Sequence, residues 1–169
     1  MTVARVAAAR TLRAHGLKVL VPAGWDGSIR RAAGAASDTV RDDVGALGTT
    51  NPVLHVASFP LPAVRGDYGG GAVERMRPSD VLVALVEFDP EAVATPLFSA
   101  AGLRRPLRTS DFSRSTMHRP LVGASGHQQF FHTGGRAFAL YVALGAHRLR
   151  SRSVPRVDRV LSTLVIDPR

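Results

Sequence analysis

The stretch His127–Gly145, HQQFFHTGGRAFALYVALG, contains two apolar runs separated by Thr-Gly-Gly. Vicinal glycines suit a tight turn that needs positive φ, so the two runs are predicted to pair as a β-hairpin. Successive side chains of a strand point to opposite faces, so four apolar side chains of the second run share one face. We expect this face to be buried under the last helix; it consists of Phe138, Leu140, Val142 and Leu144.

Short turn-forming segments separate the other predicted strands. Residues 17–25, LKVLVPAGW, predict a first strand that ends at Pro22, and residues 28–33 predict a short second strand. Residues 52–60, PVLHVASFP, predict a strand of mixed faces. Residues 79–88, SDVLVALVEF, are apolar on both faces, which is typical of a central strand.

Three segments have helical character. Residues 1–16 predict a basic N-terminal helix or tail, and residues 37–48, SDTVRDDVGALG, predict a short helix. The last segment, VPRVDRVLSTLVI at 154–166, predicts a helix whose start is marked by Ser153 and Pro155. Its apolar residues recur at the spacing of one helix face and are Val157, Val160, Leu161 and Leu164.

Together these elements predict an α+β fold with an antiparallel sheet covered by helices. The length of 169 residues suits one domain, which we place at 17–169, after the basic helix or tail at 1–16. A doubly wound parallel fold is less favoured, because the two strongest strands are joined by a tight turn and not by a crossover helix.

Three segments of the chain resemble the PsbP-like fold family: VPAGW at 21–25, GGRAFALYVALG at 134–145, and the closing VxxVLSTLVI at 157–166. That family includes photosystem II accessory subunits, Ran-GTPase-interacting proteins and many small bacterial proteins. The resemblance implies an α-β-α sandwich around an antiparallel sheet, and a binding module rather than an enzyme. It carries over no catalytic motif, and residues 60–127 have no counterpart in it.

The composition excludes several classes of chemistry. The chain has no cysteine, so disulfides, thiolate nucleophiles and zinc–thiolate sites are excluded. No apolar run approaches the ~20 residues that cross a bilayer, and the first residues lack the apolar core of a secretory signal. We therefore expect a cytoplasmic protein.

Positive charge is concentrated in the C-terminal half. The chain has 22 basic and 13 acidic residues, a formal net charge of +9. Residues 26–91 hold ten of the acids, whereas residues 104–159 hold eleven arginines and two acids. The segment HRLRSRSVPR at 147–156 predicts a surface that binds an anionic partner. The alternatives are that it is a solvated loop, or that its arginines reflect coding bias. The candidate residues of this surface are Arg148, Arg150, Arg152, Arg156 and Arg159, the first three sharing a face if the segment is extended.

The remaining chemical motifs favour structural roles. His127 and His132 lie five positions apart, so in a regular strand they face opposite sides and cannot chelate one metal. His55 is interpreted as a core or edge histidine with satisfied hydrogen bonds. Ser125 in GASGH lacks the strand-to-helix turn of a hydrolase nucleophile. The glycines at 69–71 lack both phosphate-loop signatures.

The acid pairs Asp42–Asp43 and Asp89/Glu91 have no partner that indicates acid–base catalysis. We therefore predict no catalytic, cofactor-binding or metal-ligating residue, and no cofactor. The sequence favours a non-catalytic binding or accessory domain whose partner is an acidic protein. The alternative is a nucleic-acid-associated protein that uses the arginine-rich surface. An enzyme is a third hypothesis, but no motif supports it.

Overall fold

Two antiparallel β-sheets form most of the fold in the computed structural model, which describes residues 8–31 and 51–169. The smaller sheet has the order β1-β2-β8, formed by Arg10–Ala14, Leu17–Val21 and Val165–Ile166. The larger sheet has the order β3-β4-β5-β7-β6. Its strands are Asp26–Arg31, Pro52–Ala57, Val81–Phe88, Arg136–Leu144 and Ser125–Thr133.

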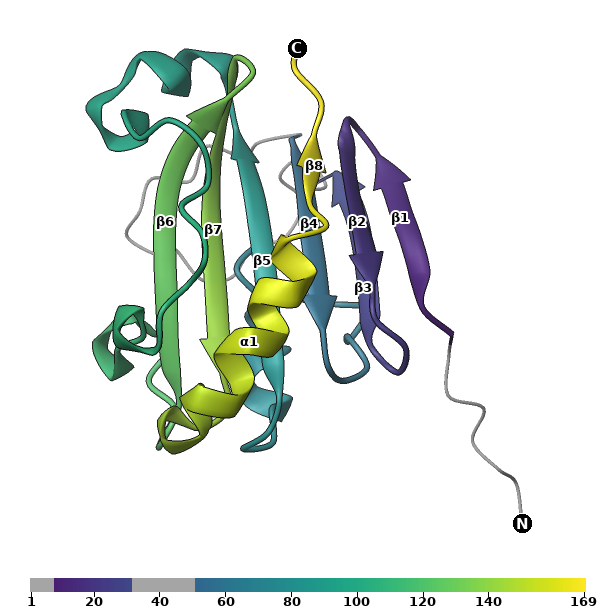
Figure 1. Cartoon of the computed structure of the whole chain (residues 1–169), viewed down its shortest axis with the longest axis vertical. Helices are drawn as coiled ribbons and strands as arrows, with labels where there is room; N and C mark the ends of the chain where they lie inside the picture. The colour runs from purple at the N-terminus through teal and green to yellow at the C-terminus, as the bar shows by residue number, and fades with distance from the viewer. Residues whose placement is uncertain (1–7, 32–50) are drawn as a thin grey trace.

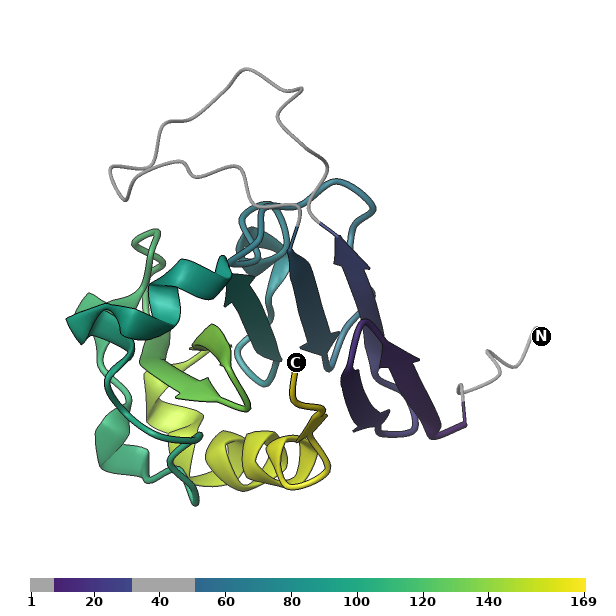
Figure 2. The ribbon, with the colours of Figure 1, turned by 90° about the horizontal axis from the view of Figure 1, so that it is seen from above.

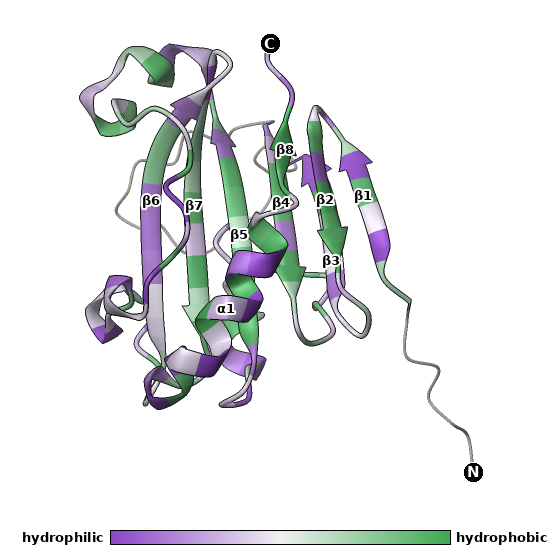
Figure 3. Ribbon diagram, in the orientation of Figure 1, coloured by the Kyte–Doolittle hydropathy of each residue, from purple (hydrophilic) through white to green (hydrophobic). Residues whose placement is uncertain are grey.

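The main core lies on one side of the larger sheet. The helix α1, Arg150–Leu161, lies diagonally across β5 and β7, and the smaller sheet lies beside it (Figure 1). Seen from above, the strands curve around the side on which α1 and the C-terminal segment lie (Figure 2). Strands β5 and β7 are mostly hydrophobic along their length, whereas α1 alternates in hydropathy (Figure 3). Apolar side chains of β2, β4, β5, β7 and α1 therefore form one shared core.

The predicted α+β fold with helices covering the sheet is wrong, and so is the α-β-α sandwich implied by the PsbP-like resemblance. Among residues 8–31 and 51–169 there is one α-helix, and it covers one face only. The opposite face of the larger sheet is covered by loops, through residues such as Phe59, Val73 and Met117 packed around Tyr141. Loops suffice there because the sheet offers mainly small side chains, such as Ala57, on that face.

A strand replaces the predicted N-terminal helix over Arg10–Ala14. Alanine and arginine favour a helix locally, but β1 gains a partner, since it pairs residue by residue with β2. His15 and Gly16 form the connecting two-residue turn, with φ of 51° and 71°. Tertiary pairing thus overrides the local preference.

The hairpin prediction is confirmed. Strands β6 and β7 pair from Thr133↔Arg136 to Ser125↔Leu144, and Gly134 and Gly135 have φ of 56° and 75°. The predicted inward face is 0% exposed and packs in the core shared with α1, as expected; it consists of Phe138, Leu140, Val142 and Leu144.

The last helix begins earlier than predicted. It starts at Arg150, directly after a 3-10 turn, and Pro155 lies inside it. The apolar stripe is confirmed for Val157, Val160 and Leu161, which are buried in the main core. The predicted end of the helix is wrong, because α1 ends at Leu161, Leu164 lies beyond it, and residues 165–166 form β8. The strands predicted within 17–25, 52–60 and 79–88 are also confirmed, at 17–21, 52–57 and 81–88, with β5 in the centre of its sheet. The strand predicted at 28–33 is observed as β3 at 26–31, and the helix predicted at 37–48 lies outside the described residues.

Short 3-10 helices lie in the connections between the larger elements. They span Val73–Arg75 (η1), Pro90–Ala94 (η2), Pro96–Phe98 (η3), Thr109–Asp111 (η4), Arg114–Thr116 (η5) and His147–Leu149 (η6). Within the part of the chain that the structure describes, no helix has the length and apolar character needed to cross a membrane.

Candidate functional site

The five candidate arginines lie on η6 and α1. Because successive helical residues are turned by about 100°, Arg152, Arg156 and Arg159 fall within an arc of about 60°. Arg150 points roughly to the other side of the helix. The shared face expected for an extended segment with Arg148, Arg150 and Arg152 is therefore wrong, because the segment is helical from residue 147.

Two of the five arginines make structural contacts. Arg150 Nη1 donates a hydrogen bond to the carbonyl oxygen of His147, at 3.0 Å. Arg156 Nη1 donates to the carbonyl oxygen of Ser79, at 2.7 Å, and its guanidinium lies 5.1 Å from the ring centroid of Trp25. This stacking is a cation–π contact that holds α1 against the β2–β3 turn. Arg150 and Arg156 are consequently less available to a partner.

A second basic segment lies beside α1. The backbone N–H of Leu107 donates to Asp158 Oδ1 of α1, at 3.0 Å, and η4 packs against the helix. Asp158 and Asp111 are the two acids of this region, and Asp111 is paired with Arg104 at 3.3 Å. Five of the exposed arginines of the two segments make up what we call the basic face: Arg108, Arg114, Arg148, Arg152 and Arg159.

The basic face is open to solvent. Within residues 8–31 and 51–169, the side chains of Arg114, Arg148, Arg152 and Arg159 make no hydrogen bond or ion pair. Loss of solvation lowers the pKa of His147, and the positive charges of Arg150 and Arg114 lower it further. This places Arg114 of the loop close enough to η6 to act on the same surface. Tertiary structure therefore joins two arginine-rich segments into one site.

The histidines singled out by sequence hold loops in place. His127 lies opposite Val142 and His132 lies opposite Ala137 in an unbroken strand pairing. Because they are five positions apart in a regular strand, the two histidines face opposite sides of β6, as predicted. His127 Nδ1 lies 3.1 Å from the carbonyl oxygen of Asp111, and His132 Nδ1 lies 2.6 Å from that of Phe98. Burial is the main cause that lowers the pKa of His127.

His55 is a core histidine with both ring nitrogens engaged, as predicted. Its Nε2–H donates to the carbonyl oxygen of Asp67, at 2.7 Å, and its Nδ1 accepts from Arg65 Nε, at 3.1 Å. Burial lowers the pKa of His55 to about 4, despite the opposing effect of the Asp67 hydrogen bond. The imidazole is therefore neutral at pH 7 and links β4 to the loop that follows it.

Neither the glycine-rich loop nor Ser125 shows catalytic geometry. Gly71 N–H donates to Glu74 Oε2, at 2.7 Å, so a carboxylate of the chain occupies this amide. Gly69 and Gly71 have φ of 87° and 89°, values that favour glycine. Ser125 is fully buried at the start of β6 and sits on a strand, not on a strand-to-helix turn.

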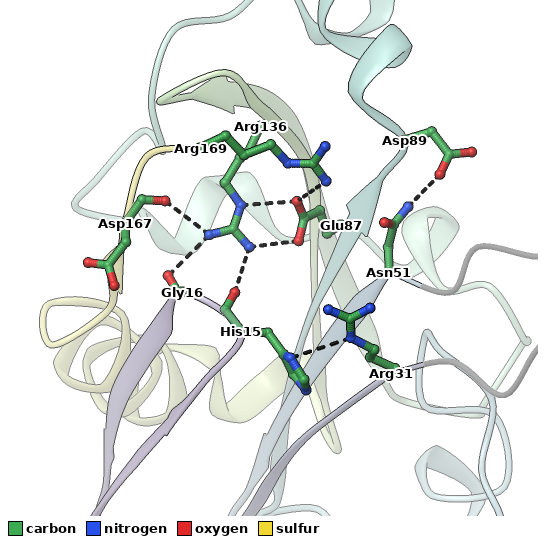
Figure 4. Close-up of polar contacts among 9 residues, drawn as sticks. All are labelled: His15, Gly16, Arg31, Asn51, Glu87, Asp89, Arg136, Asp167 and Arg169. Atoms are coloured by element: carbon green, nitrogen blue, oxygen red, sulfur yellow. Dashed lines mark hydrogen bonds and ion pairs between the residues drawn. The ribbon is translucent and has the colours of Figure 1, made fainter.

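A buried ion pair was missed by the sequence reasoning. Glu87 of β5 and Arg136 of β7 are 1% and 5% exposed. Arg136 Nε and Nη2 donate to the two carboxylate oxygens of Glu87, at 3.0 and 2.7 Å (Figure 4). Sequence reasoning counted Arg136 within the basic half, but its charge is neutralised inside the fold. A lone acid within the apolar run VLVALVEF was the available signal, because buried charges are almost always paired.

Arg136 connects four parts of the chain. Its remaining N–H groups donate to the carbonyl oxygens of His15 at 2.9 Å, Gly16 at 3.1 Å and Asp167 at 3.0 Å. All five guanidinium N–H groups therefore have acceptors. The side chain ties β7 to β5, to the β1–β2 turn and to the C-terminal segment.

A cavity of about 420 Å³ opens above this ion pair. Such a volume falls in the range of small-molecule sites. The cavity, called here the arginine cavity, is lined by His15, Gly16, Arg31, Asn51, Pro52, Glu87, Arg136, Pro168 and Arg169.

Comparison with known proteins gives no match: no family model fits the chain, and no curated protein or solved structure matches it. The resemblance to the PsbP-like family stays a prediction. The structure itself defines the class as an antiparallel two-sheet domain with one covering helix and an arginine-rich surface.

Proposed function

We propose that this chain is a non-catalytic binding domain whose basic face contacts an acidic surface of another protein. The observation that supports this function is the convergence of exposed arginines from loop 104–114 and from η6–α1. Guanidinium groups suit this role, since each can donate a bidentate pair of hydrogen bonds to a carboxylate.

An acidic protein fits the basic face better than a nucleic acid does. Single-stranded nucleic acids are bound largely by stacking of bases on aromatic side chains. The ring of Trp25 is the aromatic surface beside α1, and the guanidinium of Arg156 already lies over it.

A binding role without catalysis is supported by what the candidate catalytic groups do. His55, His127 and His132 each contact a backbone carbonyl and hold a loop against the sheet. These contacts leave the groups in structural positions. A cytoplasmic location remains a prediction from the sequence.

The test compares two triple variants of equal charge change. The first replaces Arg148, Arg152 and Arg159 with glutamine, and the second, as control, makes the same change in three exposed arginines outside the basic face: Arg13, Arg75 and Arg77. The probes are fluorescently labelled poly-glutamate and a short DNA duplex, titrated by anisotropy at several salt concentrations.

We expect poly-glutamate to bind the parent and the control alike, and the first variant about tenfold more weakly. The proposal is refuted if neither probe binds, or if both triple variants lose affinity equally. Tighter binding of the duplex, with the steep salt dependence of phosphate contacts, would refute it in favour of nucleic acid.

A further inference from the structure

We propose that the arginine cavity binds a small oxyanion, a carboxylate or a phosphate, through the guanidinium groups of Arg31 and Arg169. This site is separate from the basic face. It lies where the β1–β2 turn, the ends of β3 and β5, and the C-terminal segment meet, with the Glu87–Arg136 pair as its floor (Figure 4).

The charge of the lining selects an anion. Among the lining side chains, Arg31, Arg136 and Arg169 contribute three positive charges and Glu87 contributes one negative charge. Both oxygens of Glu87 accept hydrogen bonds from guanidinium groups, with Arg169 Nη2 at 3.2 Å from Oε1. The carboxylate is therefore occupied, and an excess of two positive charges remains. A cation would be repelled, and an apolar ligand would leave the guanidinium groups without acceptors.

Donors remain available on two of the three arginines. Arg31 Nε donates to His15 Nδ1 at 3.4 Å, and its two terminal nitrogens have no acceptor in the described part of the chain. In Figure 4 these nitrogens point to the side on which Asn51 and Glu87 lie. Arg169 uses Nη2 for Glu87, which leaves Nε and Nη1 for a ligand. Free donors from two different elements thus line the same cavity.

One of the two ligand donors, Arg169, is held in place before a ligand arrives. The backbone N–H of Arg169 donates to the carbonyl oxygen of Gly134 at 2.9 Å, so the residue is fixed at both its backbone and its side chain. The side chain of Arg169 is still 44% exposed. Arg136 is immobilised by its five hydrogen bonds. Groups that are fixed in the free protein lose less entropy on binding, which favours affinity for a small ligand.

The test is calorimetric titration of the full chain with sodium phosphate, succinate and citrate at constant ionic strength. We expect saturable binding of at least one probe, with a dissociation constant of about 1 mM or tighter. Tighter phosphate binding would identify a phosphate ligand, and tighter binding of succinate or citrate would identify a carboxylate. Failure of all three to bind at about 10 mM would overturn the proposal.

Variants locate the binding. Arg31→Gln and Arg169→Gln should each weaken the affinity by about tenfold, and Arg31→Lys should restore part of it, because the charge returns without the planar fork. The matched control Arg75→Gln should bind like the parent. Circular dichroism of every variant checks folding, and Arg31 is exposed, so its replacement should leave the fold intact.

A last variant separates this site from the proposed function. The triple glutamine variant of Arg148, Arg152 and Arg159 should lose poly-glutamate binding but keep the affinity for the small anion. If it loses the small anion while Arg31→Gln keeps it, the anion binds the basic face, and the assignment to the cavity is wrong.

Discussion

Replacing Arg136 with methionine would remove one partner of the buried ion pair while keeping an unbranched apolar stem. Glu87, which is 1% exposed, would then keep only the hydrogen bond from Arg169 at 3.2 Å. Removing one partner of a buried pair costs about 3–5 kcal/mol, because the other charge stays buried, here with the ion pair to Arg169 as its remaining compensation. Three backbone carbonyls also lose their donor, at about 1 kcal/mol each, although water in the adjoining cavity can replace part of this.

We therefore expect Arg136→Met to lower the free energy of unfolding by about 4 kcal/mol, a large share of the ~5–15 kcal/mol typical of a domain. Urea denaturation measures it, followed by circular dichroism and by the fluorescence of Trp25, the single tryptophan. The matched control is Arg13→Met, since Arg13 lies 4.0 Å from Asp167 in an exposed pair. That change should cost less than about 1 kcal/mol.

The double variant Glu87→Leu with Arg136→Met tests the reason for the loss. It removes both charges, so it should be more stable than Arg136→Met alone, and the cycle gives the coupling free energy. The reasoning is refuted if Arg136→Met costs no more than Arg13→Met. It is also refuted if the losses of the two single variants simply add in the double variant.

Three further predictions concern the core and its edges. Leu140→Ala should lower the free energy of unfolding by about 2–5 kcal/mol in urea denaturation, because Leu140 is fully buried under α1; a loss below about 1 kcal/mol would contradict the packing. Burial lowers the pKa of His55 from 6.5 to about 4. In that window the unfolded chain binds a proton that the folded chain does not, so stability should fall by up to about 3 kcal/mol as the pH drops from 6.5 to 4. Urea titrations at several pH values measure this fall, and a parent with flat stability across the window would contradict it. Arg156→Gln should shift the emission of Trp25 and cost about 1 kcal/mol, whereas Arg152→Gln should do neither; equal effects of the two changes would rule out the cation–π contact.

Local patterns in the sequence were enough to predict the central hairpin. Thr-Gly-Gly between two apolar runs requires a turn with positive φ, and Gly134 and Gly135 provide it. Alternation along the second run placed Phe138 and Leu140 on the buried face, and helical spacing placed Val157 against them. These signals act over a few residues, so they hold without knowledge of the rest of the chain.

Tertiary structure decided the features that depend on a distant partner. Arg10–Ala14 has a composition that favours a helix, yet it becomes a strand because β2 offers a pairing edge. Because the helix starts at Arg150, that arginine points away from Arg152. The hydrogen bond from Leu107 to Asp158 places loop 104–114 beside α1.

The ion pair and its cavity are the clearest examples of features that local sequence could not predict. Glu87 within an apolar run indicates that a buried cation must exist, but nothing local names Arg136, which is 49 residues away in the chain. The sequence by itself determined that this charge needed a partner, since an unpaired buried carboxylate is too costly. Only the folded chain, by bringing β5, β7, the β1–β2 turn and Arg169 together, decided which partner it has and left a cavity rich in arginine above it.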